Sequence, residues 1–171
     1  MAEANGKPIV TAVDGSAPGW EAMETALYLA SLLNRPVDVI TVIQHRKAGY
    51  FAFIDRHLEE EQQTYGAKIL EEAGERGKKA GVEVRTHLLT GERDISEAIM
   101  SYLETAGPVK FLVLGSHGHG FVSRHILGSV TERVIREVAY RGLPVPVLVV
   151  PAPKGTEEKS GGSPLTSPPM A

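Results

Sequence analysis

A glycine-rich segment, GSHGHGFVSRHILGSVT, holds the residues of this 171-residue chain that are best suited to bind an anion. Gly115 and Gly118 are separated by two residues, Gly118 and Gly128 by nine, and Ser129 follows at once. Glycine permits a positive φ and leaves no side chain between backbone N–H groups and an anion. We expect a helix to begin at Ser129, where free N–H groups and the helix dipole favour phosphate. The spacing therefore predicts a phosphate site.

From spacing alone, a purely structural interpretation of the segment stays open. Glycines that follow a strand often serve only as turns. Ser129 followed by Glu132 is typical of a capping box, which would already explain the serine. Arg124 lies inside the segment and could contact a phosphate or simply lie on the surface.

The sequence gives little support for a metal site or for the common catalytic motifs. His117, His119 and His125 lie close in sequence, but no cysteine or nearby carboxylate completes a zinc site. The sequence contains no G-x4-G-K-[ST], no G-x-S-x-G and no G-x-G-x-x-G after the first expected strand. Asp14 is the one acidic residue that we place near the predicted phosphate site, so a dedicated phosphoryl-transfer enzyme is not indicated.

Composition narrows the class of protein. The length suits one domain, and 42% hydrophobic with 23% charged residues is a globular balance. A formal charge of -3 without a basic cluster argues against nucleic-acid binding, and zero cysteines exclude disulfide, zinc-finger and iron–sulfur scaffolds. No apolar run approaches the ~20 residues that cross a bilayer, and the first ten residues do not resemble a secretory signal. We therefore expect no membrane contact and a cytoplasmic location.

The chain alternates short apolar runs with longer amphipathic ones. Strands are expected at residues 7–13, 37–43, 82–89, 111–114 and 145–150, and helices between residues 16 and 34, 55 and 80, 94 and 106, and from 129. Ser16, Asn34 and Asp94 are expected to cap helices. The helix at 55–80 is expected to bury one side, formed by Leu58, Tyr65, Ile69 and Ala73, and to be weakened by its glycines. Residues 44–54 have no clear period.

This alternation predicts an α/β fold with a doubly wound, five-stranded parallel sheet in the order 3-2-1-4-5 and helices on both faces, a Rossmann-like architecture. The strand 82–89 alternates apolar and polar residues, so it is expected at a sheet edge. Pro146 interrupts the last strand, which is therefore expected to lie at an edge or to make unusual pairings. Ligands bind such sheets where the strand order reverses, here between strands one and four. Residues 1–154 are expected to form one domain and residues 155–171 a flexible tail rich in Gly, Ser and Pro.

Four motifs give the chain a family resemblance. The pattern G-x2-G-x9-G-S is similar to the ATP-binding signature of universal stress proteins, and it is complete here. Residues 13–16, VDGS, resemble the family's opening V-D-x-S. The segments LGSVTERVI and PVPVLVVP resemble its later helix start and its closing strand, so the resemblance spans Lys7 to Pro153.

The resemblance implies an ATP site formed by Ala12, Val13, Asp14, Val42, Leu114, Gly115, His117, Gly118, Gly128, Ser129, Val130 and Thr131. Within it, Val42 would pack on the adenine, and the last four residues would bind the terminal phosphates. A Mg²⁺ or Mn²⁺ ion on the phosphates is compatible with this arrangement, because such ions need few protein ligands. The family also implies a homodimer formed through the strand from Val145 to Val150, an edge open to pairing.

The expected function is a nucleotide-responsive regulatory or binding module of the stress response. Two alternatives stay open: a slow ATPase or phosphotransferase, and an interaction protein that works without nucleotide. The chain departs from the family at residues 44–46, where many relatives have an acidic residue. It also has an aromatic insertion at residues 50–53, which we expect to pack on the second helix rather than to cover the pocket or contact a partner.

Overall fold

The computed structural model describes residues 6–44, 52–91, 94–119 and 127–151. Expectations for Arg124, His125, the side chains of the aromatic insertion at 50–53 and the tail at 155–171 lie outside what the structure describes. The described elements, in chain order, are β1 (Ile9–Ala12), α1 (Ala17–Leu33), β2 (Val37–Gln44), α2 (Ala52–Ala80), β3 (Val84–Gly91), α3 (Ile95–Thr105), β4 (Phe111–Gly115), α4 (Ser129–Tyr140) and β5 (Val147–Val150).

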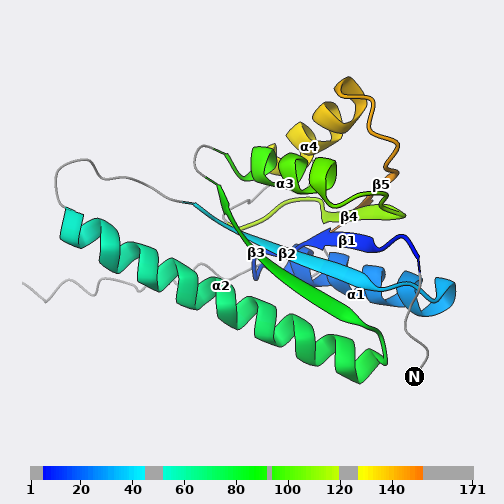
Figure 1. Ribbon diagram of the computed structural model, residues 1–171, viewed down its shortest axis with the longest axis horizontal. Helices are drawn as coiled ribbons and strands as arrows, with labels where there is room; N and C mark the ends of the chain where they lie inside the picture. The colour runs from blue at the N-terminus through cyan, green and yellow to red at the C-terminus, as the bar shows by residue number, and fades with distance from the viewer. Residues whose placement is uncertain (1–5, 45–51, 92–93, 120–126, 152–171) are drawn as a thin grey trace, which may run out of the picture.

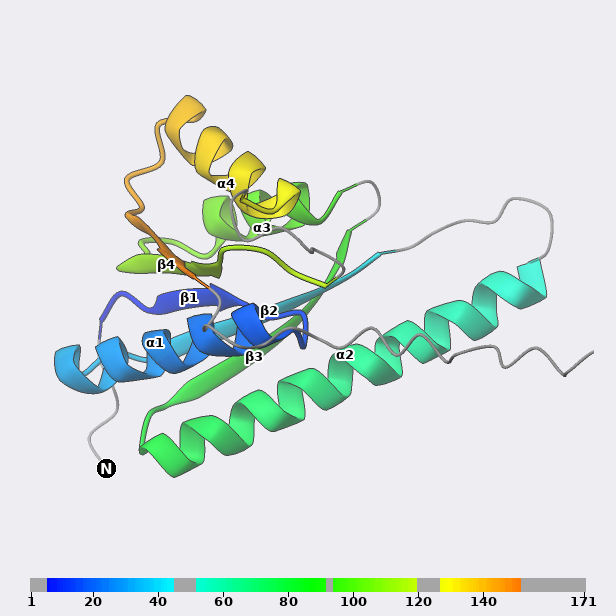
Figure 2. The ribbon, with the colours of Figure 1, turned by 180° about the vertical axis from the view of Figure 1, so that it is seen from behind.

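The strands form one parallel sheet in the order β3-β2-β1-β4-β5, which confirms the predicted topology. Helices α1 and α2 cover one face and α3 and α4 the other (Figures 1 and 2). Along β1, Ile9 is buried under the first pair of helices and Val10 under the second. Such two-sided burial stabilises each central strand by about 1.5–3 kcal/mol per large apolar side chain.

The predicted helix caps are confirmed for the first and third helices. The Ser16 hydroxyl accepts from the Gly19 N–H at 3.2 Å, and the Asp94 carboxylate accepts from the Ser96 N–H at 2.9 Å. Asn34 ends α1 in the left-handed conformation, with φ 51°. Each cap satisfies backbone groups that the helix itself leaves without partners.

The capping box expected at Ser129 and Glu132 is wrong. Gly128 is the N-cap of α4, and no side chain bonds to the helix start. The Glu132 carboxylate instead pairs with Arg136, one turn further along, at 2.6 Å. Ser129 is thus the first helical residue, and its hydroxyl is not occupied by capping.

The edge strands are where the sequence placed them, with shifted bounds. β3 is one edge and extends to Gly91. β5 is the other edge and starts only after Pro146, whose carbonyl accepts from the Leu112 N–H at 2.9 Å. Proline has no N–H to donate, so this position suits it.

The second helix differs most from expectation. It begins at Ala52, so residues 52–54 of the expected irregular segment are helical. Its first turns extend past the carboxyl end of the sheet (Figure 1). Consequently Leu58 and Tyr65 are 42% and 51% exposed rather than core residues, while Ile69 and Ala73 are buried as predicted.

Candidate functional site

A cavity of about 380 Å³ opens at the carboxyl ends of β1, β2 and β4, the point at which strand order reverses. All the residues of the predicted site line it: Ala12, Val13, Asp14, Val42, Leu114, Gly115, His117, Gly118, Gly128, Ser129, Val130 and Thr131. The sequence therefore predicted which residues the fold brings together. This volume lies within the range of small-molecule sites.

The cavity has an apolar end and a polar end. Besides Val42, apolar side chains that the sequence did not single out line it: Ile40, Ile43, Ile69, Ile95 and Ile99. The loops after β1 and β4 and the first turn of α4 supply the polar part. An apolar slot with a polar terminus fits a molecule with a flat apolar group at one end and a charged group at the other.

The first turn of α4 provides donors for that charged group. The backbone N–H groups of Ser129, Val130 and Thr131 are the first three of the helix, and none donates to an acceptor among the described residues. All three residues line the cavity. Free amides at a helix start, together with the positive end of the helix dipole, attract an anion.

The hydroxyls of this turn differ in their partners. Thr131 is buried, and its hydroxyl donates to the Gly115 carbonyl at 2.8 Å, which anchors α4 to the end of β4. Ser129 is exposed, and its hydroxyl makes no hydrogen bond within the described part of the chain. Ser129 therefore keeps a side-chain donor for a ligand, whereas Thr131 contributes its backbone N–H.

Of the two properties expected of the glycines, the positive φ is not observed. A positive φ is not found at Gly115, Gly118 or Gly128. A Cβ at Gly115 would lie 2.7 Å from the Pro18 carbonyl oxygen, and one at Gly118 would lie 2.5 Å from the Asp14 carboxylate. These glycines let segments of the chain approach one another, and the cavity wall results from that approach.

Gly128 shows the same principle. A Cβ there would lie 2.9 Å from the Cα of His117, so a side chain would push apart the two ends of the loop after β4. Its own N–H donates to the Ser116 carbonyl at 2.8 Å. The Gly128 amide is therefore not available to an anion, contrary to expectation, and the available donors start one residue later.

Asp14 ties three elements together at the cavity. Its carboxylate accepts from the Ser16 N–H at 3.0 Å and from the His119 N–H at 3.3 Å. Its carbonyl lies 3.3 Å from the Tyr65 hydroxyl of α2 and 3.0 Å from Nε2 of His119. Asp14 thus holds the loop after β4 and the middle of α2 against the end of β1.

Tyr65 and His119 are site residues that sequence reasoning missed. Both line the cavity, and the Tyr65 hydroxyl lies 3.3 Å from Nε2 of His119. Helical spacing suggested a core role for Tyr65, because it shares a side of α2 with Ile69. No local signal in the sequence distinguishes Tyr65 from the core residues on the same side of the helix.

The charge of the site is carried by few groups. Among the described lining residues, Asp14 is the one carboxylate, and no lysine or arginine lines the cavity. The described residues also contain no cluster of three or more His, Cys, Asp or Glu that could hold a metal ion. Any metal ion here would therefore be coordinated mainly by the ligand and by water, as Mg²⁺ often is at phosphates.

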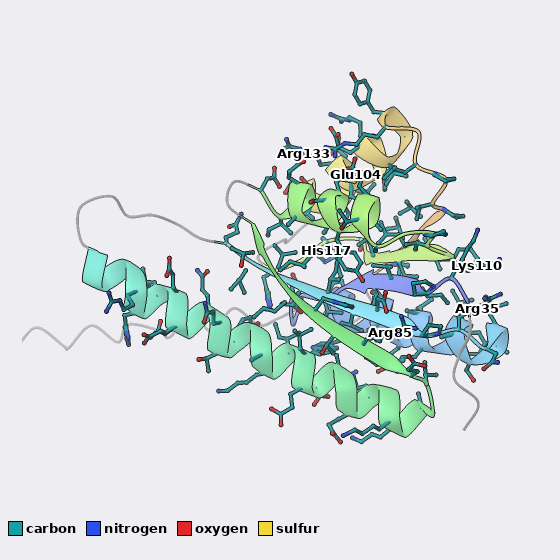
Figure 3. The ribbon with its side chains drawn as sticks, viewed as in Figure 1. Arg35, Arg85, Glu104, Lys110, His117 and Arg133 are labelled. Atoms are coloured by element: carbon teal, nitrogen blue, oxygen red, sulfur yellow. The ribbon has the colours of Figure 1, made fainter. Side chains whose placement is uncertain are left out.

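A second set of charges fixes the position of α4. Asp94, the cap of α3, forms an ion pair with Arg133 of α4, which is labelled in Figure 3. The pKa of Asp94 is lowered by its hydrogen bond from the Ser96 hydroxyl and, to a smaller extent, by Arg133. Further along, Arg141 bonds to Glu104 at 3.0 Å and to Glu97 at 2.9 Å. The Arg133 pair holds the first half of α4 beside α3, and the Arg141 pairs hold its C-terminal end there.

The fold and the position of the cavity define a class: a doubly wound α/β protein with a cavity at the switch point of the sheet, where such folds bind ligands. The model of the universal stress protein family matches residues 6–151. A universal stress protein of Methanocaldococcus jannaschii is 30% identical over 154 residues, which cover 86% of this chain and 84% of that protein. The chain belongs to the universal stress protein family.

Solved structures agree on the fold. The universal stress protein UspA from Lactobacillus plantarum has a TM-score of 0.71 at 20% identity, covering 85% of this chain and 99% of that one. An Archaeoglobus fulgidus family member in complex with dAMP has a TM-score of 0.56 at 23% identity, covering 84% and 97%. An Arabidopsis thaliana member with AMP bound has a TM-score of 0.57 at 19% identity, covering 85% and 91%.

Among the residues that the structure describes, no helix is both long enough and apolar enough to span a bilayer.

Proposed function

We propose that this protein is an adenine-nucleotide-binding module of the stress response, with ATP as a ligand and nucleotide occupancy as its regulatory signal. The observation that carries the proposal is the first turn of α4. There, the amides of Ser129, Val130 and Thr131 lack acceptors among the described residues and line a cavity whose other end is apolar. Phosphates would bind at the amides and the base at the apolar end.

Relatives support the choice of an adenine nucleotide. Family members of the same fold have been solved with AMP and with dAMP. The complete G-x2-G-x9-G-S pattern supports ATP as a ligand as well. The residues proposed to contact it are those of the predicted site, with Val42 on the base, the Ser129 hydroxyl and three amides on the phosphates, and Asp14 between them.

A divalent cation is part of the proposal for ATP. Asp14 lies beside the proposed phosphate path, and the described lining offers no lysine or arginine to offset several negative charges. Mg²⁺ or Mn²⁺ on the phosphates would reduce that repulsion. Asp14 is the one carboxylate among the described lining residues, and carboxylate oxygens are ligands that such ions prefer.

The same features favour a switch over an enzyme. Fast phosphoryl transfer needs a positioned base and strong charge stabilisation. Asp14 already accepts from Ser16 and His119, so it is engaged in holding the loops. We propose at most slow hydrolysis. Phosphate release by the purified protein well above that of an Asp14→Ala variant would instead favour the ATPase or phosphotransferase alternative.

Calorimetric titration of the full chain with ATP and AMP tests the binding proposal. Binding at micromolar to millimolar concentration supports it, and an absence of heat at millimolar nucleotide would favour the interaction protein that works without nucleotide. A Ser129→Pro variant removes one amide and the hydroxyl while suiting the first helical position. Its affinity should fall for both nucleotides, while its thermal stability stays close to that of the wild type.

We also propose a homodimer formed through the Val145 to Val150 segment, in the cytoplasm. β5 is an edge strand, and the Leu148 side chain on it is 39% exposed. An unpaired edge with an exposed apolar residue favours pairing with a second copy. Sedimentation of the full chain tests the assembly, and fractionation of cells that express it tests the location.

A further inference from the structure

A second hollow adjoins the cavity on the side away from α4. This side hollow has a volume of about 390 Å³, and Val42, Ile43, Tyr65 and Ile95 line both spaces. Three polar residues complete its lining: Gln44, Glu61 and Gln62. Since so much of its lining is shared, the side hollow continues the main cavity beyond the end of β2.

The geometry of α2 creates this hollow. A Cβ at Gly66 would lie 2.6 Å from the Leu88 side chain, so the helix touches the sheet closely at that point. One turn earlier α2 passes the end of the sheet, and Figure 1 shows it continuing without a strand beneath it. Gln62 is partly buried at this turn, whereas its neighbour Gln63 is exposed. Gln62 therefore faces the hollow.

The chemistry of the side hollow is specific. Its base is apolar, formed by Val42, Ile43 and Ile95, and its rim carries two amides and one carboxylate. Each glutamine amide offers an acceptor and two donor hydrogens, and the Glu61 carboxylate offers acceptors only. The Glu61 carboxylate lies 3.3 Å from Nε2 of His57 and stays largely exposed. A group with an apolar stem and a cationic or donor end matches this lining.

A nucleotide bound in the proposed orientation would place its base next to the side hollow. With the phosphates at α4, the base lies at the opposite, apolar end, next to Val42. In an adenine nucleotide the exocyclic amino group is on the ring edge that faces away from the ribose. We infer that the side hollow is a subsite for a substituent carried on that amino group, with a donor or cationic end. This inference rests on the proposed nucleotide function.

Three probes test the inference by calorimetry on the full chain. They are AMP, AMP with an aminohexyl chain on its exocyclic amino group, and AMP with the same chain on carbon 8, which is next to the ribose. The amino-linked probe should bind at least as tightly as AMP, and about tenfold more tightly than the carbon-8 probe. An amino-linked probe that binds about tenfold more weakly than AMP would overturn the subsite.

Matched variants locate the effect. Gln62→Trp fills the side hollow, and Gln63→Trp places the same bulk on the exposed side of the helix. The first should weaken the amino-linked probe about tenfold and leave AMP within about twofold, and the second should change neither. Equal loss of both ligands in Gln62→Trp, or no loss, would overturn the subsite.

The charge preference of the subsite and nucleotide binding itself have separate readouts. Glu61→Gln should weaken the aminohexyl probe but not its N-acetylated form, which has no positive charge; an equal effect on both would contradict the cationic preference. The two hypotheses fail differently. If AMP binds and the amino-linked probe is excluded, only the subsite is wrong. If AMP itself does not bind, the proposed nucleotide function is wrong and the subsite is refuted with it.

Discussion

The backbone N–H of Gly128 donates to the carbonyl of Ser116 at 2.8 Å, and this bond closes the loop between β4 and α4. The Ser116 N–H in turn donates to the Val150 carbonyl at 2.8 Å, so the closed loop is fixed to β5. As a result, α4 begins at a defined place beside the cavity. The glycine closes the loop, and the next three residues supply the free amides.

A side chain at position 128 should therefore disturb both stability and binding. In Gly128→Val, the added atoms would meet the His117 backbone, which cannot move without opening the loop. We expect a loss of about 1–3 kcal/mol in the free energy of unfolding. We also expect nucleotide affinity to fall about tenfold or more, measured by urea denaturation and calorimetry.

Gly74→Ala is the matched control for this variant. A Cβ at Gly74 meets nothing within 4 Å, and the residue lies inside α2. Alanine should stabilise the protein by about 0.5–1 kcal/mol and leave nucleotide affinity unchanged. Wild-type affinity in Gly128→Val, or an equal loss in both variants, would show that the loop does not shape the site.

Divalent cations should matter for ATP but not for AMP. Asp14 repels a polyphosphate, and the described lining has no lysine or arginine to offset the charge. Removing Mg²⁺ with a chelator should weaken ATP binding about tenfold and leave AMP within about twofold. In Asp14→Asn the cation dependence of ATP binding should shrink. ATP affinity that is independent of Mg²⁺ in the wild type would contradict this account of the charges.

Asp94 should contribute stability that disappears in acid. Its pKa is lowered in the folded protein, mainly by the Ser96 hydroxyl. The contribution is therefore complete above the unfolded pKa of about 3.9 and is lost as the pH falls through the lower folded value. Asp94→Ala should cost about 1 kcal/mol at pH 7, because a helix cap is lost.

Asp94→Asn separates the cap from the charge. Asparagine caps a helix about as well as aspartate but cannot pair with Arg133 as an anion. This variant should recover most of the stability that Asp94→Ala loses at pH 7. Its difference from the wild type should shrink as the pH falls below about 3.9, measured by urea denaturation. A difference that grows in acid would contradict the assigned sign.

The proposed dimer depends on an apolar edge. Leu148→Glu places a charge on β5, where the leucine side chain is 39% exposed, so the monomer should still fold. Sedimentation should show a dimer for the wild type and a species near 18.4 kDa for the variant. A wild-type chain that sediments only at 18.4 kDa would refute the dimer directly.

Sequence reasoning succeeded where one local rule decides the structure. The strand order follows from the alternation of strands and helices, and that order brings the predicted site residues at the ends of β1, β2 and β4 to one cavity. Caps at Ser16, Asn34 and Asp94 were predictable because the residue type itself satisfies the helix end. These features need no knowledge of distant contacts.

Predictions were wrong where contacts with a distant part of the chain determine the local structure. Helical spacing places Tyr65 with Ile69, but in the structure the Tyr65 hydroxyl contacts Asp14 and His119, which are far away in sequence. Glycine suggests a positive φ, whereas at Gly115 and Gly118 the cause is contact with Pro18 and Asp14, far away in sequence. Neither contact leaves a signal in the local sequence.

The most direct test of the central claim observes the amides of α4 themselves. Assigned ¹⁵N spectra of the full chain, titrated with AMP, report each backbone N–H separately. The N–H signals of Ser129, Val130 and Thr131 should shift and saturate together, with the Gly128 signal less affected because its N–H already has an acceptor. Saturable binding that leaves these three signals unmoved would show that the phosphate lies elsewhere and would contradict the proposed site.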